Sequence, residues 1–237
     1  MIILYLWMKK KLKAILFDLD DTLYLEKDFV KSGFKSVASF IQNDNGINEE
    51  VVYDRLWSIF NSGEREKIFD NYIIEFEEIN YSINELVNLY RTHSPNIKLI
   101  PGIKEYLLSL SKEYKLGIIT DGYIQTQKNK INALGLNNMF DQILITEELG
   151  RKFWKPSIVP FSTICDKLGV IPTDAIYIAD NPKKDFKGPN QLGMDSMRLR
   201  LRDGEHYKSE PSNKEFSPAI DVYSIDNLKI EMNRYNV

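Results

Sequence analysis

Residues 14–24, "AILFDLDDTLY", join an apolar run to three acids that fall within four positions, Asp18, Asp20 and Asp21. Residues two apart on an extended chain point to the same side, so the carboxylates of Asp18 and Asp20 can face one ligand. We expect Asp21 to be a solvated acid in the loop that follows. The segment therefore predicts a buried strand, 13–18, with a charged site at its carboxyl end.

Similar short apolar runs, rich in Ile and Val, recur along the chain. They cover residues 115–120, 141–146, 175–180, 195–200 and 219–224. Near-continuous apolar runs are typical of strands buried on both faces. Helical patterns lie between them, at 102–112, 124–134 and 157–168, and Gly135 and Gly169 follow the last two as C-terminal caps. Strands that alternate with helices predict an α/β fold with a doubly wound parallel sheet.

Residues 27–95 break this alternation because they contain no strand signal. Apolar and aromatic residues recur there on helical faces, within 29–41, 51–60 and 68–76. "SINE" at 82–85 is typical of a capping box at the start of a fourth helix. We therefore predict a helical domain inserted into a sheet domain, with its aromatic residues in its own core. The polar residues 203–218, which include two prolines, predict an exposed loop.

The composition excludes several classes of partner. The chain has 237 residues, of which 43% are hydrophobic and 27% charged, with a net charge of -3. That length can form a core domain and a smaller second domain. No basic stripe favours nucleic acid and no polybasic block favours an anionic membrane, so we expect neither partner.

The cysteine content and the N-terminus bear on the compartment. The single cysteine, Cys165, excludes an internal disulfide framework and fits a reducing compartment, so we expect a cytoplasmic protein with this thiol in its core. The N-terminal "MIILYLWM" precedes three lysines, whereas a signal peptide carries its positive charges first. A membrane helix needs about 20 apolar residues. We expect neither, and Met8 as the natural start would leave residues 1–7 as an extension.

Chemically active side chains follow several of the predicted strands. In an open parallel sheet, ligands bind at the carboxyl ends of the strands. Clustered carboxylates repel each other unless a cation lies among them or one of them holds a proton, and an all-oxygen site with few protein ligands suits Mg²⁺. A hydroxyl, a lysine and backbone N–H groups at helix starts can hold a phosphoryl group. The residues expected at this edge are Asp18, Asp20, Thr120, Asp121, Gly122, Lys155, Asp180 and Asp185.

This combination indicates phosphoryl transfer, and the absence of a GxxxxGK[ST] loop argues against a P-loop nucleotide enzyme. The segments resemble the motifs of the haloacid dehalogenase-like hydrolases, most of which are phosphatases. "FDLDDTLY" looks like the first motif, DxDxT, and "LGIITDG" like the second. "KP" at 155–156 is similar to the third motif, and "YIADNPKKDFKGPNQLGM" to the fourth. The resemblance covers about residues 13–198 and implies a Rossmann-like catalytic core, 1–26 and 96–237, with a helical cap, 27–95.

The resemblance also implies catalytic roles. Asp18 would be the nucleophile that accepts the phosphoryl group as an aspartyl phosphate, and Asp20 would be the general acid and base. Thr120 would donate a hydrogen bond to the phosphoryl oxygens, and Lys155 would offset the charge on the nucleophile and the phosphoryl group. The implied phosphate-binding set is Asp18, Thr120, Asp121, Gly122 and Lys155.

The resemblance further implies a magnesium site. Asp180 would bind Mg²⁺ together with Asp18 and the main-chain carbonyl of Asp20, and Asp185 would support the metal through water. Ala179 stands where the family usually has Gly before the first acid of the fourth motif. The substitution adds one methyl group near the metal, and we expect it to be tolerated.

A second departure concerns Asp121, because the family often has Asn after the second-motif Thr. If only its backbone N–H touches phosphate, the carboxylate is tolerable, but a carboxylate turned inward would weaken anion binding. An acid at Asp20 argues for an oxygen leaving group, since a halide leaves without a proton. We therefore expect a Mg²⁺-dependent phosphatase acting on a small, soluble phosphate monoester. A sugar phosphomutase and a non-catalytic phospholigand-binding module remain the alternatives, and the substrate and oligomeric state stay open.

Overall fold

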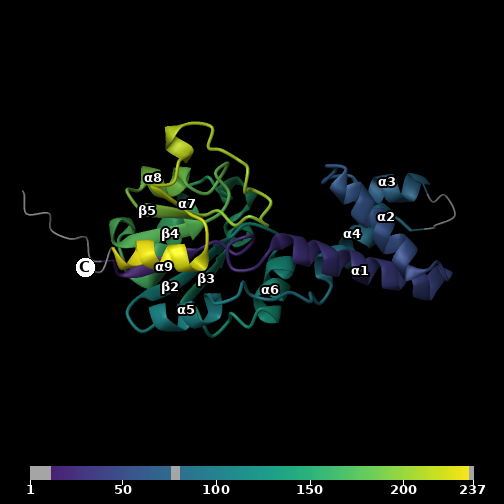
Figure 1. The fold of residues 1–237 in the computed structure, drawn as a ribbon, viewed down its shortest axis with the longest axis horizontal. Helices are drawn as coiled ribbons and strands as arrows, with labels where there is room; N and C mark the ends of the chain where they lie inside the picture. The colour runs from purple at the N-terminus through teal and green to yellow at the C-terminus, as the bar shows by residue number, and fades with distance from the viewer. Residues whose placement is uncertain (1–11, 76–80, 235–237) are drawn as a thin grey trace, which may run out of the picture. The chain divides into compact units, whose positions relative to one another are not determined.

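A computed structural model describes residues 12–75 and 81–234 and contains a six-stranded parallel sheet with strand order β3-β2-β1-β4-β5-β6 (Figure 1). The predicted α/β fold and its six strands are confirmed. The N-terminal segment with Met8, and Phe76 at the end of the third predicted helix, lie outside the described residues. The strands are β1 (Ala14–Phe17), β2 (Lys115–Thr120), β3 (Gln142–Ile145), β4 (Ala175–Ala179), β5 (Asp195–Leu199) and β6 (Ile220–Val222).

Strand β1 lies in the middle of the sheet, which explains its unbroken apolar run. All four of its residues are buried, because β2 and β4 pair along its two edges and helices cover both faces. The pairing is level at the carboxyl end, where Phe17 lies beside Ile118 of β2 and Ile178 of β4. The backbone N–H of Asp18 continues this ladder by donating to the carbonyl of Ile178 at 2.9 Å. The register therefore brings the residues that follow β1, β2 and β4 to one edge of the sheet.

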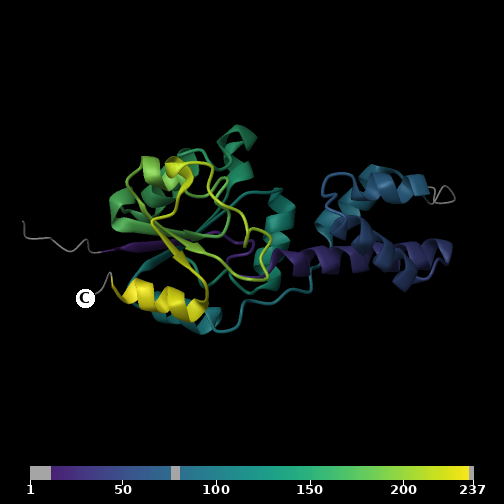
Figure 2. The ribbon, with the colours of Figure 1, turned by 45° about the horizontal axis from the view of Figure 1, so that its top comes forward.

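Helices cover both faces of this sheet (Figures 1 and 2). One face carries α7 (Val159–Leu168) and α8 (Lys187–Gln191), and the other carries α5 (Ile103–Leu110) and α9 (Ile225–Asn233). Helix α7 packs closely because Gly117 on β2 has no side chain. A Cβ there would lie 2.7 Å from Leu16 Cδ2 and 2.8 Å from Ile164 Cδ1. Cys165 lies fully buried in this core, as expected from the sequence.

The contacts divide the chain into two compact units. Among the described residues, one comprises 12–25, 99–124 and 135–234 and holds the sheet, and the other comprises 26–75, 81–98 and 125–134. The helices of the second unit are α1 (Glu26–Asn45), α2 (Glu49–Asn61), α3 (Ile68–Glu75), α4 (Ile83–Thr92) and nearly all of α6 (Ile124–Ala133). The inclusion of α6 was not foreseen. It follows from local bonds, because Asn129 on α6 donates to the carbonyl of Thr92 at 2.9 Å.

Aromatic side chains form the core of the helical unit, as the periodicity predicts. Phe34 makes edge contacts with the rings of Trp57, Phe60 and Phe69 and a tilted contact with Tyr90. Such ring pairs add about 0.5–1.5 kcal/mol each beyond the area that they bury.

The predicted capping box at the start of α4 is also present. Ser82 Oγ accepts from the Glu85 N–H at 3.3 Å, and Glu85 Oε2 accepts from the Ser82 N–H at 2.8 Å. Two backbone N–H groups that would otherwise lack partners at the helix start are thereby satisfied.

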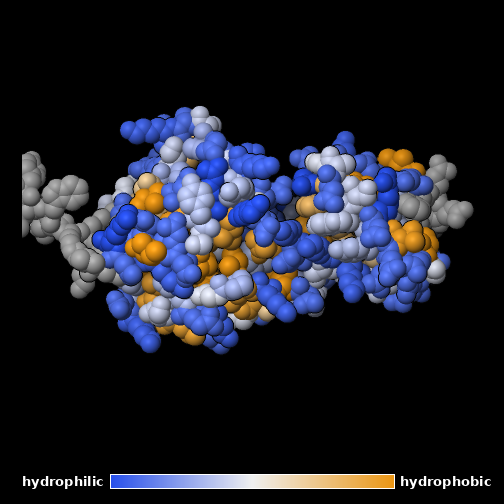
Figure 3. All heavy atoms as spheres, in the orientation of Figure 1, coloured by the Kyte–Doolittle hydropathy of each residue, from blue (hydrophilic) through white to orange (hydrophobic). Residues whose placement is uncertain are grey.

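The surface is mostly polar, and hydrophilic side chains cover most of the visible face of each unit (Figure 3). Within residues 12–75 and 81–234, no helix combines the length and the apolar character needed to span a bilayer. Neither histidine is fully exposed. His93 is only 8% exposed, and His206 is half-buried. Both are held by contacts from residues distant in sequence, which a local pattern does not reveal.

Candidate active site

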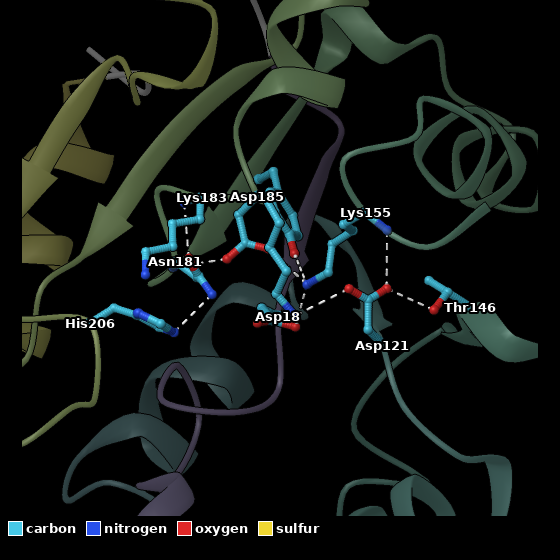
Figure 4. Close-up of polar contacts among 10 residues, drawn as sticks. Asp18, Asp121, Thr146, Lys155, Asn181, Lys183, Asp185 and His206 are labelled. Atoms are coloured by element: carbon cyan, nitrogen blue, oxygen red, sulfur yellow. Dashed lines mark hydrogen bonds and ion pairs between the residues drawn. The ribbon is translucent and has the colours of Figure 1, made fainter. Parts of the chain in front are cut away.

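Lys155 links two acids at the carboxyl end of the sheet (Figure 4). Its Nζ lies 2.8 Å from Asp18 Oδ1, 2.8 Å from Asp185 Oδ1 and 3.0 Å from the hydroxyl of Tyr177. Asp18 follows β1, Asp185 belongs to the loop after β4, and Tyr177 lies on β4. The ammonium therefore ties together two loops whose residues are far apart in the sequence.

Three buried acids form a group suited to a metal ion. Carboxylate oxygens of Asp18, Asp180 and Asp185 all lie within 4.8 Å of one another. Asp185 is held in place because its Oδ2 accepts from the backbone N–H of Asn181 at 2.9 Å. Burial, with Asp185 and Asp18 nearby, raises the pKa of Asp180 well above its usual range. Buried carboxylate oxygens that lie this close together fit a hard dication such as Mg²⁺.

Opposing effects act on the pKa of Asp18. Burial raises the pKa of its carboxyl to about 6, Lys155 acts to lower the pKa, and Asp185 acts to raise it again. For Lys155, burial acts to lower the pKa of the ammonium, but Asp18 and Asp185 outweigh burial and raise it well above its usual value. Among the protein groups, burial thus outweighs the ammonium at Asp18. A dication bound among these acids would favour the ionised carboxylate.

Asp20 and Asp21 occupy different environments in the loop after β1. Asp20 is half-buried, and its Oδ1 accepts a hydrogen bond from the hydroxyl of Tyr24. Its side chain does not belong to the metal-suited group among the described residues, and the family resemblance implies a metal contact only for its main-chain carbonyl. The expectation that Asp21 is solvated is wrong. It is 3% exposed, has a φ of 50°, and its Oδ2 accepts from the backbone N–H of Glu205 at 2.8 Å.

The end of β2 supplies Thr120, Asp121 and Gly122. Thr120 is fully buried, and Gly122 has a φ of 141°, a backbone conformation that residues with a Cβ rarely adopt. The carboxylate of Asp121 is neutralised by its surroundings. Its Oδ1 accepts from Thr146 Oγ1 at 2.7 Å and from the backbone N–H of Lys155 at 3.2 Å.

Asp121 Oδ2 in turn pairs with Lys184 Nζ at 3.1 Å. Burial acts to raise the pKa of Asp121. The charges of Lys155 and Lys184 oppose burial, as do the hydrogen bonds from Thr146 and from the backbone N–H of Lys155, and together they lower the pKa below its usual value. The departure from the family's Asn is therefore accompanied by a lysine that balances the added charge.

Several residues beside the site were not predicted. Tyr177 and Lys184 belong to the quoted fourth-motif region, but nothing in their local pattern shows that they reach Lys155 and Asp121. Arg198 on β5 is fully buried and donates to the carbonyls of Asp180, His206 and Ser209 at 2.9, 2.6 and 2.8 Å. It thereby fastens part of the predicted exposed loop, 203–218, beside the site. A basic residue within an apolar strand is the one sequence signal that could have identified it.

Several known proteins are similar to this chain in sequence. The family model described as haloacid dehalogenase-like hydrolase matches residues 15–199. Glyceraldehyde 3-phosphate phosphatase of Methanopyrus kandleri is 28% identical over 89% of this chain and 93% of its own length. The enzyme of the same name from Methanocaldococcus jannaschii is 30% identical over 79% and 85%. N-acylneuraminate-9-phosphatase of Rattus norvegicus is 27% identical over 78% and 80%.

Solved structures give the same fold. A protein of Bacillus subtilis assigned as a HAD-hydrolase and bound to magnesium has a TM-score of 0.64 at 20% identity, over 94% of this chain and 100% of its own. A HAD phosphatase from Thermococcus onnurineus has a TM-score of 0.60 at 22% identity, over 93% and 98%. At these identities the likeness concerns the fold alone.

Proposed function

Because the chain belongs to the haloacid dehalogenase-like hydrolases and is a phosphoric monoester hydrolase of phosphatase type, we propose that it cleaves a small, soluble phosphate monoester through an aspartyl phosphate on Asp18, with Mg²⁺ bound. The observation that carries this proposal is the contact between Asp18 and the buried ammonium of Lys155, beside Asp180 and Asp185. The division into a catalytic core, 1–26 and 96–237, and a helical cap, 27–95, is part of the same proposal.

The carboxylates of Asp18, Asp180 and Asp185, with the main-chain carbonyl of Asp20, would hold the magnesium ion. When bound, Mg²⁺ supplies positive charge that offsets the repulsion between a carboxylate and an anionic phosphoryl group. The three carboxylates fit this task because they are buried and close together.

In the first half of the reaction, a carboxylate oxygen of Asp18 attacks phosphorus and the bond from phosphorus to the ester oxygen breaks. Asp20 donates its proton to the departing alkoxide, so the alcohol leaves neutral. Thr120 and the backbone N–H groups of Asp121 and Gly122 would bind the phosphoryl oxygens. Lys155 positions Asp18 for the attack.

In the second half, Asp20 takes a proton from water as the water oxygen attacks phosphorus. The bond from phosphorus to Asp18 breaks, which releases inorganic phosphate and regenerates the carboxylate. Asp20 is again protonated for the next turnover. Spontaneous hydrolysis of phosphate monoesters is among the slowest reactions known, so positioning and charge stabilisation must supply most of an enhancement of up to about 10²¹-fold.

The named relatives support glyceraldehyde 3-phosphate, a triose phosphate, as the first substrate to test. A relative from Clostridium perfringens that is assigned as a pyrophosphatase, 29% identical over 76% of this chain and 80% of its own length, makes pyrophosphate a natural comparison. N-acylneuraminate-9-phosphatase adds an acylated sugar acid phosphate. We place the reaction in the cytoplasm, where phosphorylated metabolites of this kind occur and where Cys165 stays reduced.

The test is phosphate release from these three compounds and a nucleoside monophosphate, with Mg²⁺ and with EDTA. We expect Mg²⁺-dependent release that Asp18→Asn abolishes, since this change removes the attacking anion at nearly constant volume. Near wild-type turnover by Asp18→Asn would contradict the proposal. An isomerised sugar phosphate formed without net phosphate release would favour the phosphomutase alternative instead.

A further inference from the structure

The lysine predicted to contact the phosphoryl group already lies against three protein oxygens. Lys155 Nζ lies within 3.0 Å of three oxygens, on Asp18, Asp185 and Tyr177. An ammonium carries three N–H bonds. The Lys155 side chain is also 0% exposed. Two of its three N–H donors go to Asp18 and Tyr177, and the ammonium also lies against Asp185 as an ion pair, so Lys155 is engaged mainly in orienting the nucleophile.

Lys184 is a second ammonium beside the same acids. Its electrostatic neighbours are Lys155, Asp185, Asp18 and Asp121, so it lies at the site and not at a remote surface. Its side chain is 34% exposed, in contrast to the enclosed Lys155. Within the described residues, the one hydrogen bond of the Lys184 ammonium goes to Asp121 Oδ2 at 3.1 Å. Two of its three N–H donors therefore remain for an incoming anion.

Asp121 gives Lys184 a defined position. Asp121 Oδ1 accepts from Thr146 Oγ1 at 2.7 Å and from the backbone N–H of Lys155 at 3.2 Å, which leaves Oδ2 for Lys184. The pair joins the loop after β2, which carries the phosphate-binding N–H groups, to the loop after β4, which carries the metal ligands. Resting on the proposed function, we propose that Lys184 donates to the phosphoryl oxygens of the substrate and that Asp121 positions it to do so.

The direct test is binding of inorganic phosphate, the product, to the full-length protein in MgCl₂, measured by calorimetry and as product inhibition. Lys184→Met should weaken phosphate binding and raise KM by roughly 10- to 100-fold, the loss expected for one charge-assisted hydrogen bond. Lys184→Arg should retain most of the affinity. Lys183→Met is the matched control, because it removes the same charge from the neighbouring exposed position and should leave phosphate binding unchanged.

A purely structural role for Lys184 predicts a different result. If Lys184 only neutralises Asp121, then Asp121→Asn combined with Lys184→Met should restore wild-type phosphate affinity, because no unpaired acid remains. Our inference predicts that the double variant stays weak while Asp121→Asn alone binds phosphate at least several-fold more tightly than the double variant. Restoration of affinity in the double variant would overturn the inference.

Binding and turnover separate this inference from the proposed function. Phosphate that binds wild type and Lys184→Met equally well overturns the role of Lys184, whatever the catalytic activity. Lys184-dependent phosphate binding by a protein that releases no phosphate from any ester would support Lys184 and refute only the proposed reaction. Thermal unfolding of each variant in the absence of phosphate identifies any loss of affinity that results from misfolding.

Discussion

Lys155 shows how one residue organises the site, since its three oxygen neighbours come from the loop after β1, the loop after β4 and strand β4 itself. Lys155, Asp18 and Asp185 were predicted from the sequence because each stands in a recognisable local motif. Tyr177 was not predicted, because its hydroxyl becomes relevant only when β4 places it 3.0 Å from Lys155 Nζ. Local motifs predict the charged residues, whereas long-range packing selects the neutral residues that position them.

Tyr177→Phe tests this positioning role. The change removes one acceptor from Lys155 at constant ring packing, and a net hydrogen bond of about 1 kcal/mol corresponds to a loss of roughly fivefold in kcat. Tyr106→Phe on α5 is the matched control, because the Tyr106 hydroxyl is buried with no hydrogen-bond partner among the described residues and its removal should not reduce stability. Steady-state kinetics and thermal unfolding check both variants. An unchanged kcat for Tyr177→Phe would show that Asp18 and Asp185 suffice to position the lysine.

At the scale of secondary structure, the sequence predicted all six strands as short apolar runs. Strands β1 and β4 are buried along their whole length, whereas the edge strands β3 and β6 are only partly buried. The inserted helices were likewise visible as periodic faces. The association of α6 with them was not, because it rests on polar bonds from Thr126 and Asn129 to backbone carbonyls at the end of α4 and just beyond it. Periodicity reports which face of an element is buried but does not identify the element that covers it.

The capping box of α4 provides a test at this scale. Ser82→Ala removes the acceptor for the Glu85 N–H and should lower the free energy of unfolding by about 1 kcal/mol. Ser58→Ala, at an exposed position inside α2, should be neutral or slightly stabilising because alanine is the better helix former. Denaturant unfolding measures both changes. Equal effects of the two substitutions would contradict the assigned cap.

Residues 203–218 were predicted to form an exposed loop, and Arg198 and Asp21 fasten its first part through His206, Ser209 and Glu205. Arg198→Leu leaves three carbonyl oxygens without their donor and should cost about 3 kcal/mol. Hydrogen exchange of the amides at 204–209 should accelerate in this variant. Arg202→Leu, at an exposed position nearby, serves as the control. Exchange that is equally fast in wild type would show that the loop is not held by these bonds.

At the scale of the whole molecule, unfolding should depend on pH through His93. Its Nδ1 donates to the Tyr90 carbonyl at 2.6 Å, and in the neutral ring its Nε2 accepts from Ser32 Oγ at 3.1 Å. Burial, aided by Lys130, lowers the pKa of His93 despite the hydrogen bond to Tyr90. The unfolded chain therefore binds the proton more readily than the folded chain does.

The sign follows from this difference. The contribution of His93 to stability is complete above the unfolded pKa of about 6.5 and is lost as pH falls through the lower folded pKa. His93→Gln should therefore flatten the decline in unfolding free energy below about pH 6.5, measured by denaturant titration at several pH values. A decline of the same steepness in His93→Gln and wild type would exclude His93 as its source.

The central claim, that Asp18 carries the phosphoryl group, is tested most directly by chemical trapping. Borohydride reduces an acyl phosphate to an alcohol and leaves free carboxylates unchanged. Enzyme mixed with a substrate that it hydrolyses, quenched during turnover and treated with borohydride, should yield a peptide with homoserine at position 18, identified by mass spectrometry. The product should be absent without substrate and in Asp18→Asn. Homoserine at another acid, or its absence from an enzyme that is turning over, would contradict the account.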